Sequence, residues 1–193
     1  MPKVLLFHHV QGLTPGVTAF ADMLRAAGHT VYVPDLLDGR LFGSIPEGIA
    51  YVKSFGFQTI IDRGIAAAAT LPQDLVYIGM SLGVMPAQSL AQTRPGALGA
   101  VLLHGAVTVN EFSPTWPRQV PVHFGCSSAP ISTRCPLRTP LLNGRRISAP
   151  IGLSPTSRSG LKRRILLLVL PLSTSIFLLN QRTRSLSTGR SAR

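Results

Sequence analysis

Short apolar runs alternate with segments of helical periodicity through the first 122 residues of the chain. The runs that we interpret as strands cover residues 4–7, 30–33, 75–78 and 100–103, and a fifth begins at Val120. Runs of this length suit strands covered on both faces, and strands separated by helices form a parallel sheet. The pattern therefore predicts an α/β fold, doubly wound, in which a mostly parallel sheet carries helices on both faces.

The third run passes directly into the turn Gly79-Met-Ser-Leu-Gly83, which a helical pattern follows. Small residues on both sides of a serine let the chain turn sharply, so that the hydroxyl projects over the edge of the sheet. The N-terminus of the next helix adds partial positive charge where an oxyanion would develop. We therefore predict that Ser81 is a nucleophile. The alternative is a glycine-rich turn with a serine of no catalytic role.

A serine nucleophile of this kind needs two backbone amides to hold the oxyanion. One would be the amide of Leu82, the residue after the nucleophile. The other comes from the loop after an early strand, where the amide of Val10 is our candidate and that of His9 the alternative. We interpret His8 as a polar residue that ends the strand.

Four segments resemble, in content and in order, those of the dienelactone hydrolase family of α/β-hydrolases. They are Leu5-Leu-Phe-His-His-Val-Gln-Gly-Leu-Thr-Pro15, Val33-Pro-Asp-Leu-Leu-Asp-Gly-Arg40, Gly79-Met-Ser-Leu-Gly83 and Leu102-Leu-His-Gly105. The resemblance covers about residues 3–122. It implies the α/β-hydrolase fold and the hydrolysis of a small ester or lactone through a covalent acyl-enzyme, with no cofactor and no metal.

The resemblance also implies roles for single residues. Many members of the family have serine at the nucleophile, where the founding enzymes have cysteine, and Ser81 would take this position. His9 lies where the founding enzymes have a glutamate beside the nucleophile, which is a departure from their pattern. The acid and the histidine are expected later in the chain, in that order.

The partners that Ser81 needs are missing from their expected positions. After Ser81 the sequence has one carboxylate, Glu111, and two histidines, His104 and His123. Glu111 precedes the strand after which the acid is expected, and His123 lies inside that strand. We therefore assign neither acid nor base, and we interpret His104 as a strand-end residue.

The net positive charge of the chain, +12, comes entirely from its C-terminal part. Residues 1–122 hold seven basic and seven acidic residues, whereas residues 123–193 hold twelve basic residues and no acidic one. Since Asp and Glu make up about 12% of ordinary sequences, the second part is not an ordinary continuation of the first. We divide the chain into an incomplete α/β-hydrolase-like core, 1–122, and a basic tail, 123–193, that is disordered or out of frame. A frameshift near codon 123 explains both the missing partners and the composition.

Two other interpretations take the tail as a functional segment. A non-catalytic α/β domain could bind nucleic acid or an anionic membrane through clusters such as Arg145-Arg146 and residues 162–164. Alternatively, the apolar segment 165–179 could anchor a hydrolase, although its 15 residues fall short of the roughly 20 that a span needs. We expect neither a nucleic-acid nor a membrane partner. The N-terminus shows no targeting signal, so we expect a cytoplasmic protein.

Overall fold

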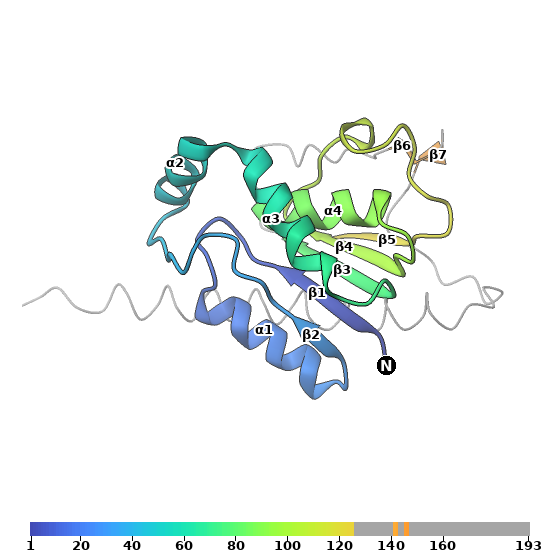
Figure 1. Cartoon of the computed structure of the whole chain (residues 1–193), viewed down its shortest axis with the longest axis horizontal. Coiled ribbons are helices and arrows are strands. Elements are labelled where there is room, and N and C mark those ends of the chain that lie inside the picture. The colour runs from blue at the N-terminus through green and yellow to red at the C-terminus, as the bar shows by residue number, and fades with distance from the viewer. Residues whose placement is uncertain (126–140, 143–144, 147–193) are drawn as a thin grey trace, which may run out of the picture. The chain divides into compact units, whose positions relative to one another are not determined.

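The computed structural model describes residues 1–125, 141–142 and 145–146. A parallel sheet of five strands forms in the order β2-β1-β3-β4-β5 (Figure 1). Its strands are β1 (Lys3–Phe7), β2 (Thr30–Tyr32), β3 (Leu75–Met80), β4 (Gly99–Leu103) and β5 (Val122–Gly125). The predicted α/β fold class, a mostly parallel sheet with helices between its strands, is confirmed for these residues.

Helices connect the strands wherever the sequence pattern predicts them. The elements are α1 (Pro15–Ala26), α2 (Ile45–Phe55), α3 (Phe57–Ala69), α4 (Val84–Thr93) and the short 3-10 helices η1 (Ser81–Gly83) and η2 (Val109–Glu111). A parallel crossover is right-handed, so α1, which leads to β2, and α3, which leads to β3 on the other side of β1, lie on opposite faces. The sheet is therefore doubly wound.

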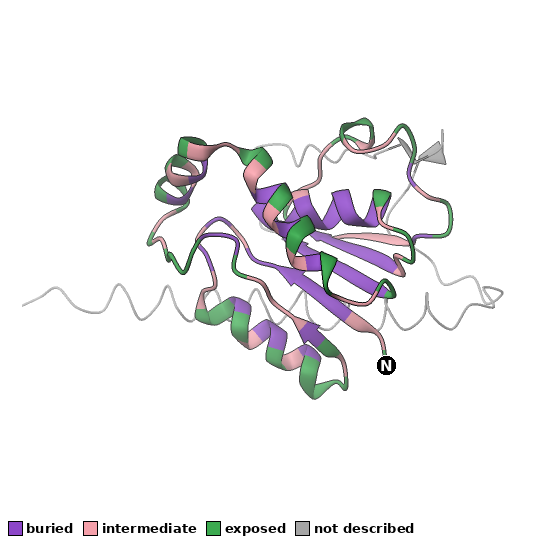
Figure 2. Ribbon diagram, viewed as in Figure 1, coloured by how far each residue is buried: buried purple, intermediate pink, exposed green. Residues whose placement is uncertain are grey.

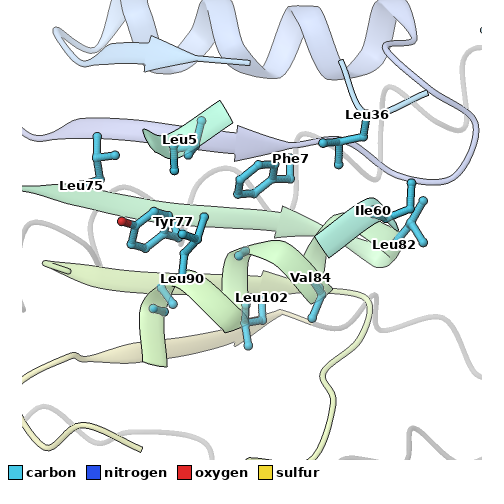
Figure 3. Packing of buried hydrophobic residues seen from close by; sticks show 14 of the residues in the cluster. Leu5, Phe7, Leu36, Ile60, Leu75, Tyr77, Leu82, Val84, Leu90 and Leu102 are labelled. Carbon is cyan, nitrogen blue, oxygen red and sulfur yellow. The ribbon is translucent and has the colours of Figure 1, made fainter. Parts of the chain in front are cut away.

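The main core lies between the sheet and the helices α3 and α4. Leu5, Phe7, Tyr77 and Leu102 alternate along their strands and pack in one buried cluster with residues of both helices, among them Ile60 (Figure 3). The buried residues of α1 are Val17, Phe20, Ala21 and Leu24, and none of them belongs to that cluster. Figure 2 shows the central strands β1, β3 and β4 mostly buried, with exposed residues on the outer sides of the helices. Both faces of the sheet are covered, as the apolar runs predict.

The chain divides into two units, residues 1–150 and 151–193. The first holds the sheet and, in addition, an antiparallel pair formed by β6 (Leu141–Leu142) and β7 (Arg145–Arg146). The second lies outside the described residues, as do the apolar segment 165–179, the basic cluster 162–164 and both cysteines. The division at residue 122 stays a prediction, and β5 lies across it. No helix in the described part of the chain is long and apolar enough to cross a membrane.

Candidate active site

The strand order changes direction between β1 and β3. After β1 the chain adds β2 on one side, and after β3 it adds β4 and β5 on the other. In open α/β sheets, ligands bind outside the carboxyl ends of the strands at such a point. The segments that leave β1 and β3 there begin with His8 and Ser81, which places the predicted nucleophile at this position of the sheet.

The strand register brings three residues with chemically reactive side chains to this edge. The pairs nearest the edge are Phe7 with Gly79, Gly79 with Leu102 and Met80 with Leu103. His9 follows Phe7 by two positions, Ser81 directly follows Met80, and His104 directly follows Leu103. The three residues therefore leave adjacent strands at the same edge of the sheet.

Ser81 has an unusual backbone conformation. Its φ is +49°, in the left-handed region that side chains other than glycine rarely adopt, and the residue is exposed. Met80 before it is extended, with φ −109° and ψ 115°, and η1 begins directly at Ser81. Such strain costs on the order of 1 kcal/mol and is typical of functional sites. A sharp strand-to-helix turn of this kind exposes the hydroxyl above the sheet.

The two glycines that flank the turn have no room for a side chain. A Cβ on Gly79 would lie 2.4 Å from the carbonyl oxygen of Gly83. A Cβ on Gly83 would lie 2.4 Å from the carbonyl oxygen of Phe7 and 2.7 Å from that of His8. The turn therefore packs directly on the end of β1, which explains why the segment needs small residues at both positions.

The two amides predicted for the oxyanion belong to neighbouring segments. Leu82 is the second residue of η1, and Val10 is in the loop that follows β1. The amide of Val10 donates no hydrogen bond to a described residue. The Val10 carbonyl, in the next peptide group, lies against α2, where a Cβ on Gly48 would be 2.3 Å from its oxygen. The structure thus brings Ser81 and both candidate amides to the same edge of the sheet.

His9 is fixed within its own loop. Its Nδ1 accepts a hydrogen bond from the Gln11 amide at 3.2 Å, and its Nε2 lies 3.2 Å from the Thr14 hydroxyl. Burial lowers the pKa of His9, and charge on His8 or His104 lowers it further. The ring is therefore neutral with its proton on Nε2, and it braces the loop that carries the Val10 amide.

His8 does more than end the strand. Its side chain is fully buried, Nδ1–H donates to the His9 carbonyl at 2.8 Å, and Nε2 accepts from the Leu36 amide at 2.9 Å. It therefore joins the loop after β1 to the loop after β2. Burial lowers the pKa of His8, although the His9 carbonyl and the carboxylate of Asp35 oppose this effect.

Because His8 is buried, we predict that acid lowers the free energy of unfolding. The unfolded chain takes up a proton near pH 6.5, whereas folded His8 resists it to a lower pH, so stability is complete above about pH 6.5 and falls below it. The slope reaches at most about 1.4 kcal/mol per pH unit per histidine. We expect His8→Gln to flatten the dependence of the urea midpoint on pH between about pH 7.5 and about pH 5. Equal slopes in the wild type and His8→Gln would contradict this assignment.

The three residues considered as partners of Ser81 lie in different places. His104 directly follows β4 with φ +63° and is exposed. His123 lies inside β5, opposite Val101, which is three residues or about 10 Å behind His104 along the sheet. Glu111 is exposed in η2 and makes no hydrogen bond or ion pair through its side chain with a described residue. Of these three residues, only His104 directly follows a strand that pairs with β3, at the edge of the sheet where Ser81 lies.

Sequence reasoning missed two buried glutamines of α4. Gln88 donates to the Val107 carbonyl at 2.9 Å and accepts from the Val107 amide at 3.0 Å. Gln92 donates to the Val109 carbonyl at 2.9 Å. The helix that begins after the Ser81 turn thus holds the loop that begins at His104. Two glutamines four residues apart on a largely apolar helix were the available signal.

The described residues contain no group of three or more histidine, cysteine or acidic side chains placed to hold a metal ion.

No family model and no curated protein sequence matches the chain. Similar solved structures include a dienelactone hydrolase-like promiscuous phosphotriesterase from metagenomic libraries, with 20% sequence identity and a TM-score of 0.45. A structure described as a dienelactone hydrolase from Klebsiella pneumoniae subsp. pneumoniae has 18% identity and a TM-score of 0.47. A hydrolase of the α/β superfamily from Xanthomonas campestris has 21% identity and a TM-score of 0.41.

These matches are partial on both sides. They cover 56%, 64% and 65% of this chain, respectively. The chain spans 49% and 60% of the first two structures and 71% of the third. The resemblance to dienelactone hydrolase-like structures is therefore confined to part of the chain, and the fold class stated above rests on its own strand order and register.

Proposed function

We propose that this chain carries the core of a serine hydrolase that cleaves a small carboxylic ester or lactone through an acyl-enzyme on Ser81. The observation that carries the proposal is the conformation of Ser81: an exposed serine with φ +49°, between a buried strand and a helix. The motif resemblance over residues 3–122 supplies the substrate class.

The proposed reaction follows from the placement of the groups. The Ser81 hydroxyl attacks the substrate carbonyl, and the amides of Leu82 and Val10 hold the oxyanion that forms. Collapse of the tetrahedral intermediate expels the alcohol, which in a lactone stays attached to the acyl group. Water then attacks the acyl-enzyme through a second oxyanion and frees Ser81.

We propose further that the reaction is impaired in this chain. No carboxylate follows β5 in the sequence, because residues 123–193 hold no acidic residue, and no histidine follows His123. A site without a complete triad keeps only about 10³–10⁴-fold acceleration over water, from oxyanion stabilisation and binding. The frameshift near codon 123 is our explanation for this loss.

A fluorophosphonate probe tests the nucleophile directly. The probe forms a bond from phosphorus to an activated serine oxygen and releases fluoride, which requires no acyl-enzyme turnover. We expect peptide mass spectrometry of the labelled full chain to find the adduct on Ser81, and Ser81→Ala to carry none. Ser54, an exposed helical serine, serves as the internal control and should stay unlabelled. An unlabelled Ser81 in folded protein, shown by circular dichroism, would overturn the proposal.

A further inference from the structure

We infer that His104 takes the proton of Ser81 in this chain. This inference deepens the proposed function and depends on it. It assigns a base at the end of β4, the strand that follows the nucleophile strand in the sheet, rather than late in the chain.

Placement is the first support. The last residues paired between β3 and β4 are Met80 and Leu103, and Ser81 and His104 directly follow them, with φ of +49° and +63°. The amide of His104 donates to the Gly125 carbonyl at 2.8 Å, which ties this turn to the end of β5. Two adjacent strands therefore end in residues of left-handed conformation at the same edge of the sheet, and these residues are the predicted nucleophile and a histidine.

The hydrogen bonds of the ring distinguish His104 from His9, the other histidine at this edge of the sheet. Both ring nitrogens of His9 have partners in its own loop, the Gln11 amide and the Thr14 hydroxyl. Neither the ring of His104 nor the hydroxyl of Ser81 makes a hydrogen bond with a described residue. A general base has to be free to bond the proton that it removes, and such bonds commonly tighten only when substrate binds.

Helix α4 supports both the Ser81 turn and the loop that begins at His104. Ser81 is continuous with α4 through η1, and Gln88 of α4 binds both the amide and the carbonyl of Val107, three residues after His104. The serine turn and the histidine loop thus rest on the same helix. Their relative position is determined by packing rather than by a mobile connection.

The charge state of His104 suits a base. Although part of His104 is exposed to solvent, partial desolvation of its ring lowers its pKa, so the ring is neutral at pH 7. The titratable groups on the neighbouring elements are His9 after β1, His123 in β5 and Glu111 in η2, and of these His9 interacts with charge on His104. No described carboxylate bonds the ring, so nothing orients His104 as the third group of a triad would.

His104 and Ser81 account for every proton transfer in the proposed reaction. One ring nitrogen of His104 accepts the Ser81 proton as the Oγ–C bond forms, and the imidazolium returns it to the alcohol as the C–O bond to the leaving group breaks. In the second half, His104 takes a proton from the attacking water and gives it to Ser81 Oγ as the acyl bond breaks. No other reactant is needed.

The test uses variants that His104's backbone tolerates. Asn and Gly both adopt φ near +63°, so His104→Asn and His104→Gly keep the turn, and His29→Asn changes a histidine at the opposite end of the sheet. We expect His104→Asn to slow labelling of Ser81 by fluorophosphonate about 100-fold at neutral pH. It should also remove the loss of rate that the wild type shows in acid, at a pH below the ordinary pKa of about 6.5 because burial lowers the pKa of His104.

The glycine variant separates proton transfer from a structural role. Added imidazole should restore labelling in His104→Gly and leave His29→Asn and the wild type unaffected. Labelling of Ser81 at the wild-type rate and with the wild-type pH profile in His104→Asn would overturn this inference and leave the proposed function intact. Absence of Ser81 labelling in the wild-type chain would overturn the proposed function itself.

Discussion

Gly83→Ala is expected to destabilise the fold by about 3 kcal/mol and to abolish labelling of Ser81. The backbone of Gly83 has φ −64°, which alanine adopts freely, so the effect comes from space alone. The new methyl group would lie 2.4 Å from the Phe7 carbonyl oxygen and 2.7 Å from that of His8. Both oxygens belong to the backbone at the end of a buried strand, so neither can rotate away as a side chain would. Either the turn or β1 has to move.

Urea denaturation of Gly83→Ala measures this effect against a matched control. Gly16 is also a helical glycine, in the first turn of α1, and its nearest neighbour to a new Cβ is the Thr14 hydroxyl at 3.9 Å. Gly16→Ala should therefore leave the midpoint unchanged or raise stability by up to about 1 kcal/mol. A Gly83→Ala protein that unfolds at the wild-type urea concentration would show that the turn does not pack on β1 as described.

Local pattern was sufficient to predict the elements of the fold. The apolar runs around Leu5, Tyr77 and Leu102 became buried parallel strands, because a strand covered on both faces has to be apolar throughout. The boundaries differed slightly: the fifth strand begins at Val122 rather than at Val120. The turn at Ser81 was predictable because a small residue on each side leaves a sharp strand-to-helix connection as the simplest path.

Which residues of different strands and loops lie near one another could not be predicted from local pattern. His9, Ser81 and His104 are far apart in sequence, and only the strand order brings them to the same edge of the sheet. The sequence pattern suggests that His8 is a polar strand end, yet it is buried because the Leu36 amide and the His9 carbonyl satisfy both of its nitrogens. Local periodicity carries no information about such long-range hydrogen bonds, which distinguish the structural His8 from a histidine whose ring bonds no described residue.

Restoring the reading frame is expected to produce the largest gain in activity. If a frameshift near codon 123 removed the acid and the histidine, another frame downstream encodes a strand, an aspartate after it and a later histidine. Since loss of triad members costs about 10⁴–10⁶-fold in turnover, the restored chain should hydrolyse a small ester such as p-nitrophenyl acetate at least about 10³-fold faster. Sequencing codons 115–130 of the gene and expressing the restored chain tests this.

The restored chain also tests which histidine takes the proton of Ser81, His104 or the later histidine of the restored frame. Ser81→Ala should remove the gain, because both chains use the same nucleophile. His104→Asn should slow the restored chain much less than the present one, since the restored histidine, oriented by its aspartate, would take the serine proton in place of His104. Stop codons close to codon 123 in the other frames would contradict the frameshift. The basic tail would then be a genuine part of the protein, and His104 would remain the base that Ser81 has.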